Sequence, residues 1–287
     1  MAELYKSKPV VEDHLRKLTD KCLELKEKGV LPSMKVILVG NNPASLIYTR
    51  NKKKFCEKFG ADCEIIHLDE KISEKDFLGQ VEKISADDKV HGCFIQLPLP
   101  DQLKHIEVGD LIPPHKDVDG FHRDNLNALL HGNEDKALLP CTPKGIITML
   151  DFYGEKLQGK NVVVIGRSMI VGKPMMLMML NKNATATICH SRTVNLAEHT
   201  KRADIIVSAV GIAKFVKKEH LRAAGDQVLV DVGMNHDENG KLCGDIDFED
   251  VVDHCKAITP VPGGVGPMTI LSLAQNLLQA AENSLYK

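Results

Sequence analysis

The sequence predicts an α/β protein with two domains, each built on its own parallel sheet. Short apolar runs alternate with amphipathic segments along nearly the whole chain, and 287 residues are enough for two domains with substantial cores. One apolar run also leads directly into a glycine turn and a helix, the order that a doubly wound nucleotide-binding sheet needs. We therefore expect the second domain to be Rossmann-like, with a ligand cleft between the domains.

The first set of strand candidates is short and rich in β-branched residues. Helical periodicity between them, as in residues 73–86, predicts crossover helices and hence parallel strands. The candidates are residues 35–40 (KVILVG), 63–68 (CEIIHL) and 92–97 (GCFIQL).

A second set of strand candidates follows a proline-rich boundary. Pro140 disfavours helix before it, Thr142 can cap a helix and Pro143 suits a first helical turn, which predicts a connecting helix over 144–153. The amphipathic segment 268–285 is expected to pack back on the first domain. The second set comprises residues 162–165, 185–190, 205–210 and 228–232, and the predicted domains are residues 1–139 with 268–287, and residues 140–267.

Composition and charge exclude several classes of protein. The content is 43% hydrophobic and 26% charged, and the net charge of −2 favours neither a nucleic-acid nor a membrane partner. The first residues lack the pattern of a secretory signal, and no apolar run is long enough to span a membrane. Eight cysteines form no CxxC pair and several lie in apolar strands, which is typical of reduced, buried thiols in a cytoplasmic protein without a zinc site.

Residues 161–174 (NVVVIGRSMIVGKP) read as a buried strand, a glycine turn and a helix. Gly166 and Gly172 bracket the turn, which also contains Arg167 and Ser168. Such a turn brings backbone N–H groups and a helix N-terminus against a pyrophosphate. The spacing departs from the usual GxGxxG, so an ordinary strand-to-helix corner is the alternative.

The end of the next strand indicates which dinucleotide would bind. An NAD-selective site carries an acidic residue there for the ribose 2′-hydroxyl, yet no Asp or Glu occurs between Asn181 and Leu196. Ser191 and Arg192 stand there instead, and a guanidinium suits a 2′-phosphate. NADP is therefore the expected cofactor, unless Arg192 is only a solvated loop charge.

Residues 43–60 predict a helix that carries a lysine on its apolar face. Tyr48, Lys52, Phe55 and Phe59 follow the spacing of one helical face. A lysine withdrawn from water has a lowered pKa, which suits proton transfer. The alternative is a lysine whose stem covers the rings while its ammonium group reaches water.

Three further segments carry candidate ligand-binding groups. Gln96 lies inside an apolar run at a strand end, where a ligand or Lys52 could satisfy its amide. Asp117 and Asp119 share a glycine turn, so one can form the turn and leave the other free to recognise a ligand. Residues 259–269 (TPVPGGVGPMT) allow close backbone approach to a flat ligand, or form a hinge.

Five segments in this order resemble the bifunctional methylenetetrahydrofolate dehydrogenase/cyclohydrolase family. They are SLIYTRNK, QLPLP, KDVDGF, GRSMIVGKP and PVPGGVGPMT, and the resemblance extends from the first strand to the last helix. It implies oxidation of 5,10-methylenetetrahydrofolate with NADP, then hydrolysis to 10-formyltetrahydrofolate, in a cytoplasmic homodimer of one-carbon metabolism that serves purine biosynthesis.

The resemblance also implies roles for individual residues. Lys52 corresponds to the catalytic lysine, with Gln96 supporting it, Tyr48 stacking on the pterin and Asp119 gripping the pterin edge. The remaining implied substrate contacts are Leu97, Pro262 and Gly263, and the implied cofactor contacts are Gly166, Arg167, Ser168, Gly172, Ser191, Arg192 and Met234.

Two positions depart from the family pattern with little consequence. Arg192 replaces a common lysine and keeps the positive charge, and Met234 replaces an isoleucine beside the nicotinamide with a similar apolar volume. Two other functions stay open: an NADP-dependent dehydrogenase of another small substrate, and a protein that binds NADP without turnover.

Overall fold

The computed structural model describes residues 2–286, and the chain divides into two compact units. Unit 1 contains the described residues up to Glu12 together with Thr142–Thr269, and unit 2 contains Asp13–Cys141 and the described residues from Ile270 onward. The sequence predicts that the N-terminal residues belong to the first domain. In the structure they join unit 1 instead, because strand β1 (Glu3–Leu4) pairs in parallel with β11 (Ala257–Ile258).

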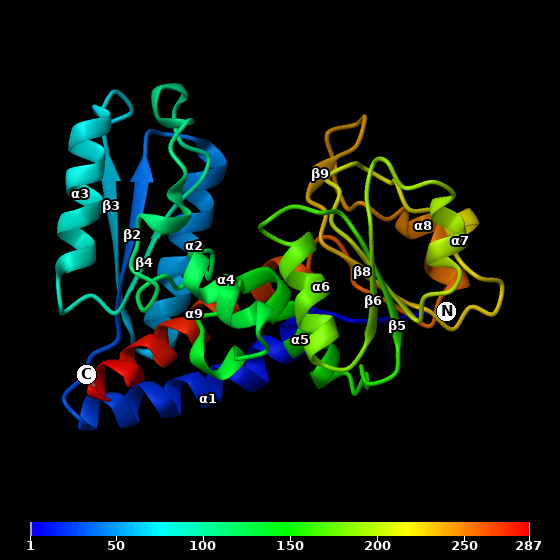
Figure 1. Ribbon diagram of the computed structural model, residues 1–287, viewed down its shortest axis with the longest axis horizontal. Coiled ribbons are helices and arrows are strands. Elements are labelled where there is room, and N and C mark those ends of the chain that lie inside the picture. Colours follow the sequence, from blue (N-terminus) through cyan, green and yellow to red (C-terminus); the bar gives the residue numbers. More distant parts are fainter. Residues whose placement is uncertain (1, 287) are drawn as a thin grey trace. The chain divides into compact units, whose positions relative to one another are not determined.

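Unit 2 is built around a three-stranded parallel sheet in the order β3-β2-β4 (Figure 1). Its strands are β2 (Ser33–Val39), β3 (Asp62–Leu68) and β4 (Gly92–Ile95). The central strand β2 is buried along almost its whole length, which explains its continuous apolar sequence. Strand β4 is shorter than predicted and ends at Ile95, so that Gln96 follows the strand.

Helix α2 (Pro43–Phe59) joins β2 to β3. The Asn42 side chain caps its start by accepting a hydrogen bond from the Ser45 N–H at 3.1 Å, and Pro43 occupies the first turn. Its buried residues recur at helical spacing and include Lys52. The helix that periodicity predicts over residues 43–60 therefore forms, and Lys52 lies on its buried face.

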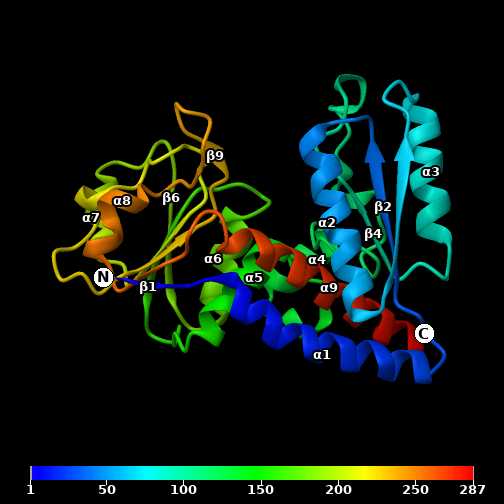
Figure 2. The same ribbon diagram turned by 180° about the vertical axis from the view of Figure 1, so that it is seen from behind.

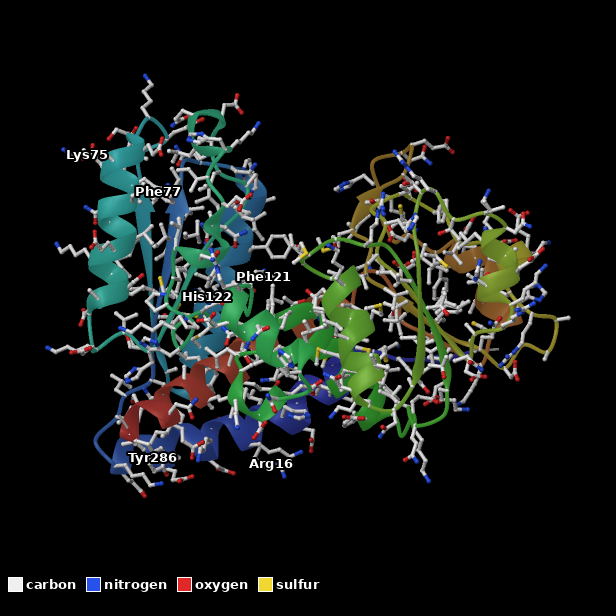
Figure 3. The ribbon with its side chains drawn as sticks, viewed as in Figure 1. Arg16, Lys75, Phe77, Phe121, His122 and Tyr286 are labelled. Atoms are coloured by element: carbon white, nitrogen blue, oxygen red, sulfur yellow. The ribbon has the colours of Figure 1, made fainter. Side chains whose placement is uncertain are left out.

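Helix α3 (Glu74–Ala86) joins β3 to β4 and begins at the Ser73 cap. Phe77 is fully buried and points from α3 toward the sheet, whereas Lys75 points away from it (Figure 3). After β4 the chain forms short 3₁₀ turns (Asp101–Leu103, Val108–Asp110 and Glu134–Lys136) and helix α4 (Arg123–Leu130).

Unit 1 contains a six-stranded parallel sheet in the order β1-β11-β8-β7-β5-β6. Its two edge strands, β1 and β6, are labelled in Figure 2. The chain leaves β5 for β6 on one side and then places β7 on the other side of β5. The sheet therefore has a topological switch point at the carboxyl ends of β5 and β7, where open α/β sheets bind ligands. The additional strands are β5 (Asn161–Ile165), β6 (Thr185–Cys189), β7 (Ile205–Ser208) and β8 (Val228–Asp231).

Helices and a small hairpin complete unit 1. Its apolar core includes Val163, Ile165, Ile206 and Leu229 from three neighbouring strands. The remaining elements are α6 (Gly172–Asn181), α7 (Leu196–Thr200), α8 (Phe248–Val251), the hairpin β9 (Asn235–His236) and β10 (Leu242–Cys243), and the 3₁₀ turns Lys218–His220 and Val252–His254.

Each of the three boundaries between the units falls inside a helix. These helices are α1 (Ser7–Glu27), α5 (Cys141–Phe152) and α9 (Val265–Asn283), which is followed by the 3₁₀ turn Ser284–Tyr286. None of the helices within residues 2–286 has the length and apolar character required to cross a membrane. All eight cysteines are described, and seven of them are buried.

Candidate active site

The Lys52 side chain is the central feature of unit 2. It is only 9% exposed, although it carries an ammonium group. Its Nζ lies 3.9 Å from the centroid of the Phe94 ring and donates a hydrogen bond to Gln96 Oε1 at 3.3 Å. The ring face attracts the cation, while the amide orients it, so the amine occupies a defined position.

Burial lowers the pKa of Lys52, because removal from water disfavours the charged form. The negative charge of Asp119 opposes part of this shift, so the carboxylate acts on the ammonium group within the same unit. Lys52 thus combines a fixed position with a weakened hold on its proton, which are the two properties a proton-transfer group needs. The alternative of an ammonium group in open water is wrong for this lysine.

Gln96 links the lysine to the start of α2. Its Nε2 donates a hydrogen bond to the Leu97 carbonyl at 2.7 Å, and the Ser45 hydroxyl donates to the same carbonyl at 3.3 Å. Gln96 is half-buried, and its amide oxygen accepts a hydrogen bond from Lys52, one of the two partners that the sequence left open. Tyr48 is also half-buried, one turn before Lys52 on α2, and burial raises the pKa of its phenol.

The two aspartates of the 117–120 turn have different roles. Asp117 is buried, and its carboxylate accepts hydrogen bonds from Gly120 N (3.1 Å), His122 N (2.7 Å) and Asn125 Nδ2 (3.1 Å). Burial raises its pKa to about 6. Asp117 is therefore the turn-forming residue. Asp119 lies in the same turn and is half-buried.

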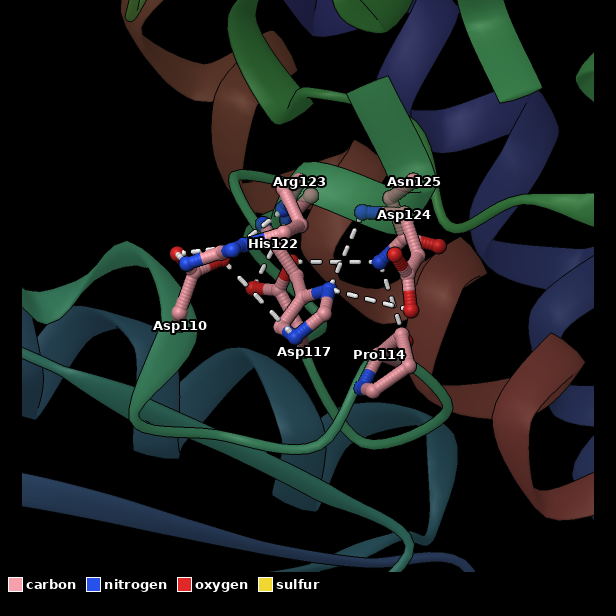
Figure 4. A network of polar contacts seen from close by, with 8 residues as sticks. Asp110, Pro114, Asp117, His122, Arg123, Asp124 and Asn125 are labelled. Carbon is pink, nitrogen blue, oxygen red and sulfur yellow. Dashed lines mark hydrogen bonds and ion pairs between the residues drawn. The ribbon is translucent and has the colours of Figure 1, made fainter. Parts of the chain in front are cut away.

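A polar network joins this region to the start of α4 and to the preceding loop (Figure 4). Arg123 donates two side-chain hydrogen bonds to Asp110, one of them from Nε at 2.8 Å, and the Arg123 N–H adds a third at 3.0 Å. Asn125 also donates to the Pro114 carbonyl at 2.9 Å. The turn that carries Asp119 is thus fixed to the start of α4 and to the preceding loop.

Sequence reasoning missed two residues near the lysine. Phe94 supplies the ring under the ammonium group, and Ser45 is buried beside the Leu97 carbonyl. Ser45 and Lys52 are seven residues apart on α2, so helical spacing could have found Ser45. Phe94 reaches the site from another element, which periodicity along one helix does not reveal.

The glycine turn of unit 1 is defined by close backbone contacts. Gly166 has φ of +126°, and a Cβ there would lie 2.3 Å from the Ala209 carbonyl oxygen. A Cβ on Gly172 would lie 2.2 Å from the Gly166 carbonyl oxygen. Only glycine fits either position, since real Cβ atoms do not approach backbone oxygens so closely.

Ser168 caps the helix that follows the turn. Its hydroxyl oxygen accepts hydrogen bonds from Val171 N at 3.2 Å and Gly172 N at 3.3 Å. The expected backbone N–H groups at the start of α6 are thus bonded to Ser168 rather than left open. Ser168 and Arg167 are both exposed.

The carboxyl end of β6 carries the other predicted cofactor residues. Strands β5 and β6 pair with Ile165 opposite Cys189, so Arg167 and Ser191 each lie two residues beyond a matched pair. Ser191 and Arg192 are exposed, and the Arg192 N–H donates to His190 Nδ1 at 3.1 Å. Within residues 2–286, neither Arg167 nor Arg192 has an ion-pair partner, so both guanidinium groups remain available to an anion.

The remaining predicted contacts fall in both units. Met234 is 52% exposed and follows β8, the neighbour of β7, in unit 1. Pro262 and Gly263 are exposed in unit 1, and the Gly263 carbonyl accepts hydrogen bonds from the Ser7 N–H and hydroxyl, both at 2.8 Å. Leu97 is exposed in unit 2, next to Gln96. Their roles as ligand contacts stay predictions.

The chain matches two family models that together cover most of its length. Residues 5–119 match the catalytic domain of tetrahydrofolate dehydrogenase/cyclohydrolase, and residues 140–285 match the NAD(P)-binding domain of the same family. Among curated relatives, it is 46% identical to the bifunctional protein FolD of Bacillus pumilus over 99% of both chains, and 47% identical to that of Listeria innocua over 98% of both.

Solved structures show the same relationship. The bifunctional FolD enzyme of Campylobacter jejuni superposes with a TM-score of 0.93 at 41% identity, covering 99% of each chain. The Trypanosoma brucei enzyme, solved with NADP and an inhibitor, gives a TM-score of 0.91 at 30% identity, covering 100% of this chain and 99% of the other. The chain therefore belongs to the tetrahydrofolate dehydrogenase/cyclohydrolase family.

Proposed function

We propose that this protein oxidises 5,10-methylenetetrahydrofolate to 5,10-methenyltetrahydrofolate with NADP and then hydrolyses the product to 10-formyltetrahydrofolate. The observation that carries the proposal is the buried Lys52 amine, with its lowered pKa, beside Gln96 and in the field of Asp119. Family membership supports both activities, since its relatives are bifunctional proteins. Unit 1 is proposed to bind the cofactor, and unit 2 is proposed to bind the folate and to supply the proton-transfer group.

The glycine turn fits a pyrophosphate. Gly166 and Gly172 let the turn pack against the Ala209 and Gly166 carbonyl oxygens, where a Cβ atom would not fit, and this close packing gives the tight turn that precedes a pyrophosphate-binding helix. The Ser168 hydroxyl accepts two N–H groups and still has its own proton to donate. We infer that it donates this proton to a phosphate oxygen, in front of the positive end of α6.

The residues beyond β6 fit a 2′-phosphate. Ser191 can donate one hydrogen bond, and the Arg192 guanidinium can form charge-assisted, bidentate bonds to phosphate oxygens. Arg167 lies at the end of the neighbouring strand and adds positive charge on the same edge. These groups favour NADP over NAD, in line with the NADP that is bound to the Trypanosoma brucei relative.

The oxidation step needs orientation rather than acid–base catalysis. Bound NADP supplies the hydride acceptor. The substrate carbon is flanked by two nitrogens whose lone pairs stabilise the cation that remains after hydride loss. The protein must therefore hold the two reactants in place and keep water away until transfer is complete.

We assign the folate to the region of unit 2 around Lys52. We propose that the Tyr48 ring stacks on the pterin and that the Asp119 carboxylate accepts hydrogen bonds from donors on the pterin edge. Gln96 and Leu97 line the same region, next to the amine that they help to fix.

Hydrolysis depends on proton transfers by Lys52. The neutral amine accepts a proton from a water molecule as its oxygen bonds to the methenyl carbon. The resulting ammonium then protonates the ring nitrogen as the bond from that nitrogen to the carbon breaks, and the remaining hydroxyl proton passes to solvent. Gln96 keeps the amine aligned, and burial keeps its pKa low enough for both transfers.

Further parts of the proposal concern the cellular setting. The family resemblance favours a cytoplasmic homodimer that works in one-carbon metabolism and supplies purine biosynthesis. Sedimentation at micromolar protein concentration tests the dimer, and a monomer at that concentration would contradict it.

A spectroscopic assay tests the activities. Methylenetetrahydrofolate and NADP are mixed with the protein, and NADPH and methenyltetrahydrofolate are followed by absorbance, with NAD run side by side. We expect NADPH formation, and hydrolysis of added methenyltetrahydrofolate without cofactor. Absence of NADPH formation would indicate a protein that binds NADP without turnover, while turnover of another substrate alone would indicate a different dehydrogenase.

Arg192→Gln tests the choice of cofactor. The loss of a charge-assisted contact to the 2′-phosphate should raise the KM for NADP about tenfold or more and leave the KM for NAD unchanged. Arg202→Gln, an exposed position in the same unit, provides a matched control. Equal effects on both cofactors would contradict a 2′-phosphate contact.

A further inference from the structure

A buried carboxylate, Asp245, lies under the loops at the carboxyl edge of the sheet in unit 1. It is fully buried and is not one of the residues assigned above to cofactor or substrate. Its neighbour Asp231 ends strand β8 and accepts a hydrogen bond from the Asp245 N–H at 2.8 Å. The backbone of Asp245 is therefore anchored to the sheet.

Asp245 accepts hydrogen bonds from three consecutive backbone N–H groups in the loop after β7. Its Oδ2 accepts hydrogen bonds from Val210 N at 2.7 Å and Gly211 N at 3.2 Å, and its Oδ1 accepts one from Ile212 N at 3.1 Å. The Ser208 hydroxyl also contacts Oδ2 at 3.4 Å. One charged side chain thus fixes the path of the whole loop from Val210 to Ile212.

The same carboxylate holds the segment after β8. The Asn235 side chain donates to Asp245 Oδ1 at 2.9 Å, and a Cβ on Gly233 would lie 2.3 Å from that oxygen. Gly233 and Asn235 flank Met234, whose side chain is exposed. Asp245 therefore holds Asn235 on one side of Met234 as well as the loop after β7, while Asp231 accepts the Gly233 N–H on the other side at 2.9 Å.

Both segments lie where a dinucleotide would cross the sheet. Ala209, which precedes the first loop, places its carbonyl oxygen against Gly166, and β7 is the strand beside β5 at the switch point. Ligands of open α/β sheets bind in the crevice at this point. Ile212 and Met234 are 54% and 52% exposed there, which gives each segment an apolar side chain that a planar ring can cover.

The direction of the peptide groups indicates which part of the dinucleotide these loops would contact. The N–H groups of Gly211 and Ile212 point at Asp245, so the carbonyl groups of Val210 and Gly211 in the same trans peptides point the opposite way. Acceptors of this kind repel a phosphate but suit a neutral ring that carries an amide. The phosphate contacts instead belong to the β5 and β6 ends of the sheet.

We propose that Asp245 is a positioning residue for the nicotinamide half of NADP. This inference rests on the proposed function of unit 1. The carboxylate touches neither reactant; it holds the 210–212 and 233–235 segments in the arrangement that receives the ring. Loss of the carboxylate frees both segments and leaves the pyrophosphate and 2′-phosphate contacts in place.

The test compares two ligands on the full-length protein. Asp245→Asn keeps the size of the side chain and removes its charge. Calorimetry should show NADP binding about tenfold weaker or more, because several charge-assisted bonds are lost, while adenosine 2′,5′-bisphosphate, which lacks the nicotinamide, should bind within about twofold of the unmodified protein. Equal weakening of both ligands, or of neither, overturns the proposal.

Two further measurements separate this role from general damage. Asp204→Asn is the matched control: its carboxylate also accepts a backbone N–H, from Asn161 at 2.9 Å, but at the amino end of β5. That variant should leave the binding ratio of the two ligands unchanged. Binding of the bisphosphate should persist in Asp245→Asn and shows that unit 1 is folded, and retained hydrolysis of methenyltetrahydrofolate shows the same for unit 2.

A milder variant decides the matter if Asp245→Asn does not fold. Asn235→Ala removes only the bond that holds the segment around Met234. It should raise the ratio of the NADP dissociation constant to that of the bisphosphate, and an unchanged ratio overturns the proposal. If the unmodified protein binds neither ligand, the proposed function itself fails, which is a distinguishable result.

Discussion

The two units build their candidate sites by opposite means. In unit 2 a charged side chain, Lys52, is taken out of water and held by Phe94 and Gln96. In unit 1 side chains are absent at the critical points, and Gly166 and Gly172 let backbone approach backbone. The first site depends on the lowered pKa of a buried amine, and the second depends on close backbone packing that only glycine allows.

This difference predicts different responses to substitution. A change at Lys52 removes a chemical group and should spare the fold, because a long apolar side chain can occupy the same volume. A change at Gly166 adds an atom where none fits and should disturb the local backbone. Variants in each unit can therefore separate lost chemistry from lost shape, since hydrolysis is proposed to use unit 2 and cofactor binding to use unit 1.

Replacement of Lys52 by Met should have the largest effect. Hydrolysis of methenyltetrahydrofolate should fall by roughly two to four orders of magnitude, because no proton-transfer group remains, while folate binding largely survives. Steady-state hydrolysis and a folate titration measure the two quantities. Lys54→Met, at an exposed position of the same helix, is the control, and near-normal hydrolysis in Lys52→Met would remove the lysine from the mechanism.

Gly166→Ala should come next and should act on unit 1. Its Cβ would lie 2.3 Å from the Ala209 carbonyl oxygen, and relief of such overpacking costs about 1–3 kcal/mol. We expect NADP binding to weaken by one to two orders of magnitude, measured by calorimetry, with hydrolysis in unit 2 retained. Gly159→Ala is the control, since Gly159 also has a positive φ, +77°, but has open space around it. Similar loss in both variants would show that backbone strain, and not the close approach, matters.

Asp119→Ala should weaken folate binding about tenfold to a hundredfold, because donors on the pterin edge lose a charged acceptor. NADP binding should be unaffected, since the carboxylate belongs to unit 2. Separate titrations with each ligand measure this, with Asp88→Ala as an exposed control. Unchanged folate affinity would reject the contact. Asp117→Ala should differ by destabilising the turn itself.

The last expected effect concerns the dependence of stability on pH. Burial raises the pKa of Asp117 in unit 2 to about 6 and that of Asp231 in unit 1 to about 7, both from 3.8. The folded state therefore favours the protonated form of each carboxyl group. The stability that protonation contributes is fully present below about pH 4 and is lost as the pH rises through 6 for Asp117 and through 7 for Asp231. The loss amounts to about 1.4 kcal/mol per pKa unit.

Hydrogen-exchange mass spectrometry can follow this loss separately in each unit. Asp117→Asn should flatten the pH dependence of unit 2 between pH 4 and 6 and leave that of unit 1 unchanged. An unaltered profile in unit 2 would mean that Asp117 does not titrate in this range.

The parts of the fold that local patterns govern could be predicted from the sequence. Helical spacing located Lys52 on a buried face, and the run from strand to glycine turn located Gly166. These predictions rest on residues that lie within one element or at its end. The alternation of strands and helices predicted both parallel sheets, because it follows from the same local periodicity.

The features that patterns missed depend on residues far apart in the chain. Phe94 reaches Lys52 from another element, and Asp245 bonds a loop more than thirty residues earlier, at Val210. The pairing of Glu3–Leu4 with β11 could not be predicted either, because a two-residue strand carries almost no periodicity. Tertiary contact, rather than local preference, decides all three.

The pairing of Glu3 with Ala257 also has a consequence for biosynthesis. A ribosome adds about 5–20 residues per second, so the nascent N-terminal segment is made on the order of ten to fifty seconds before its partner strand exists. Throughout that interval strand β1 has no partner strand, and the backbone N–H of Tyr5 lacks its acceptor, the Ile258 carbonyl. The last step in assembling unit 1 must therefore come late in translation or after release, and it is the stage at which a chaperone would have most to protect.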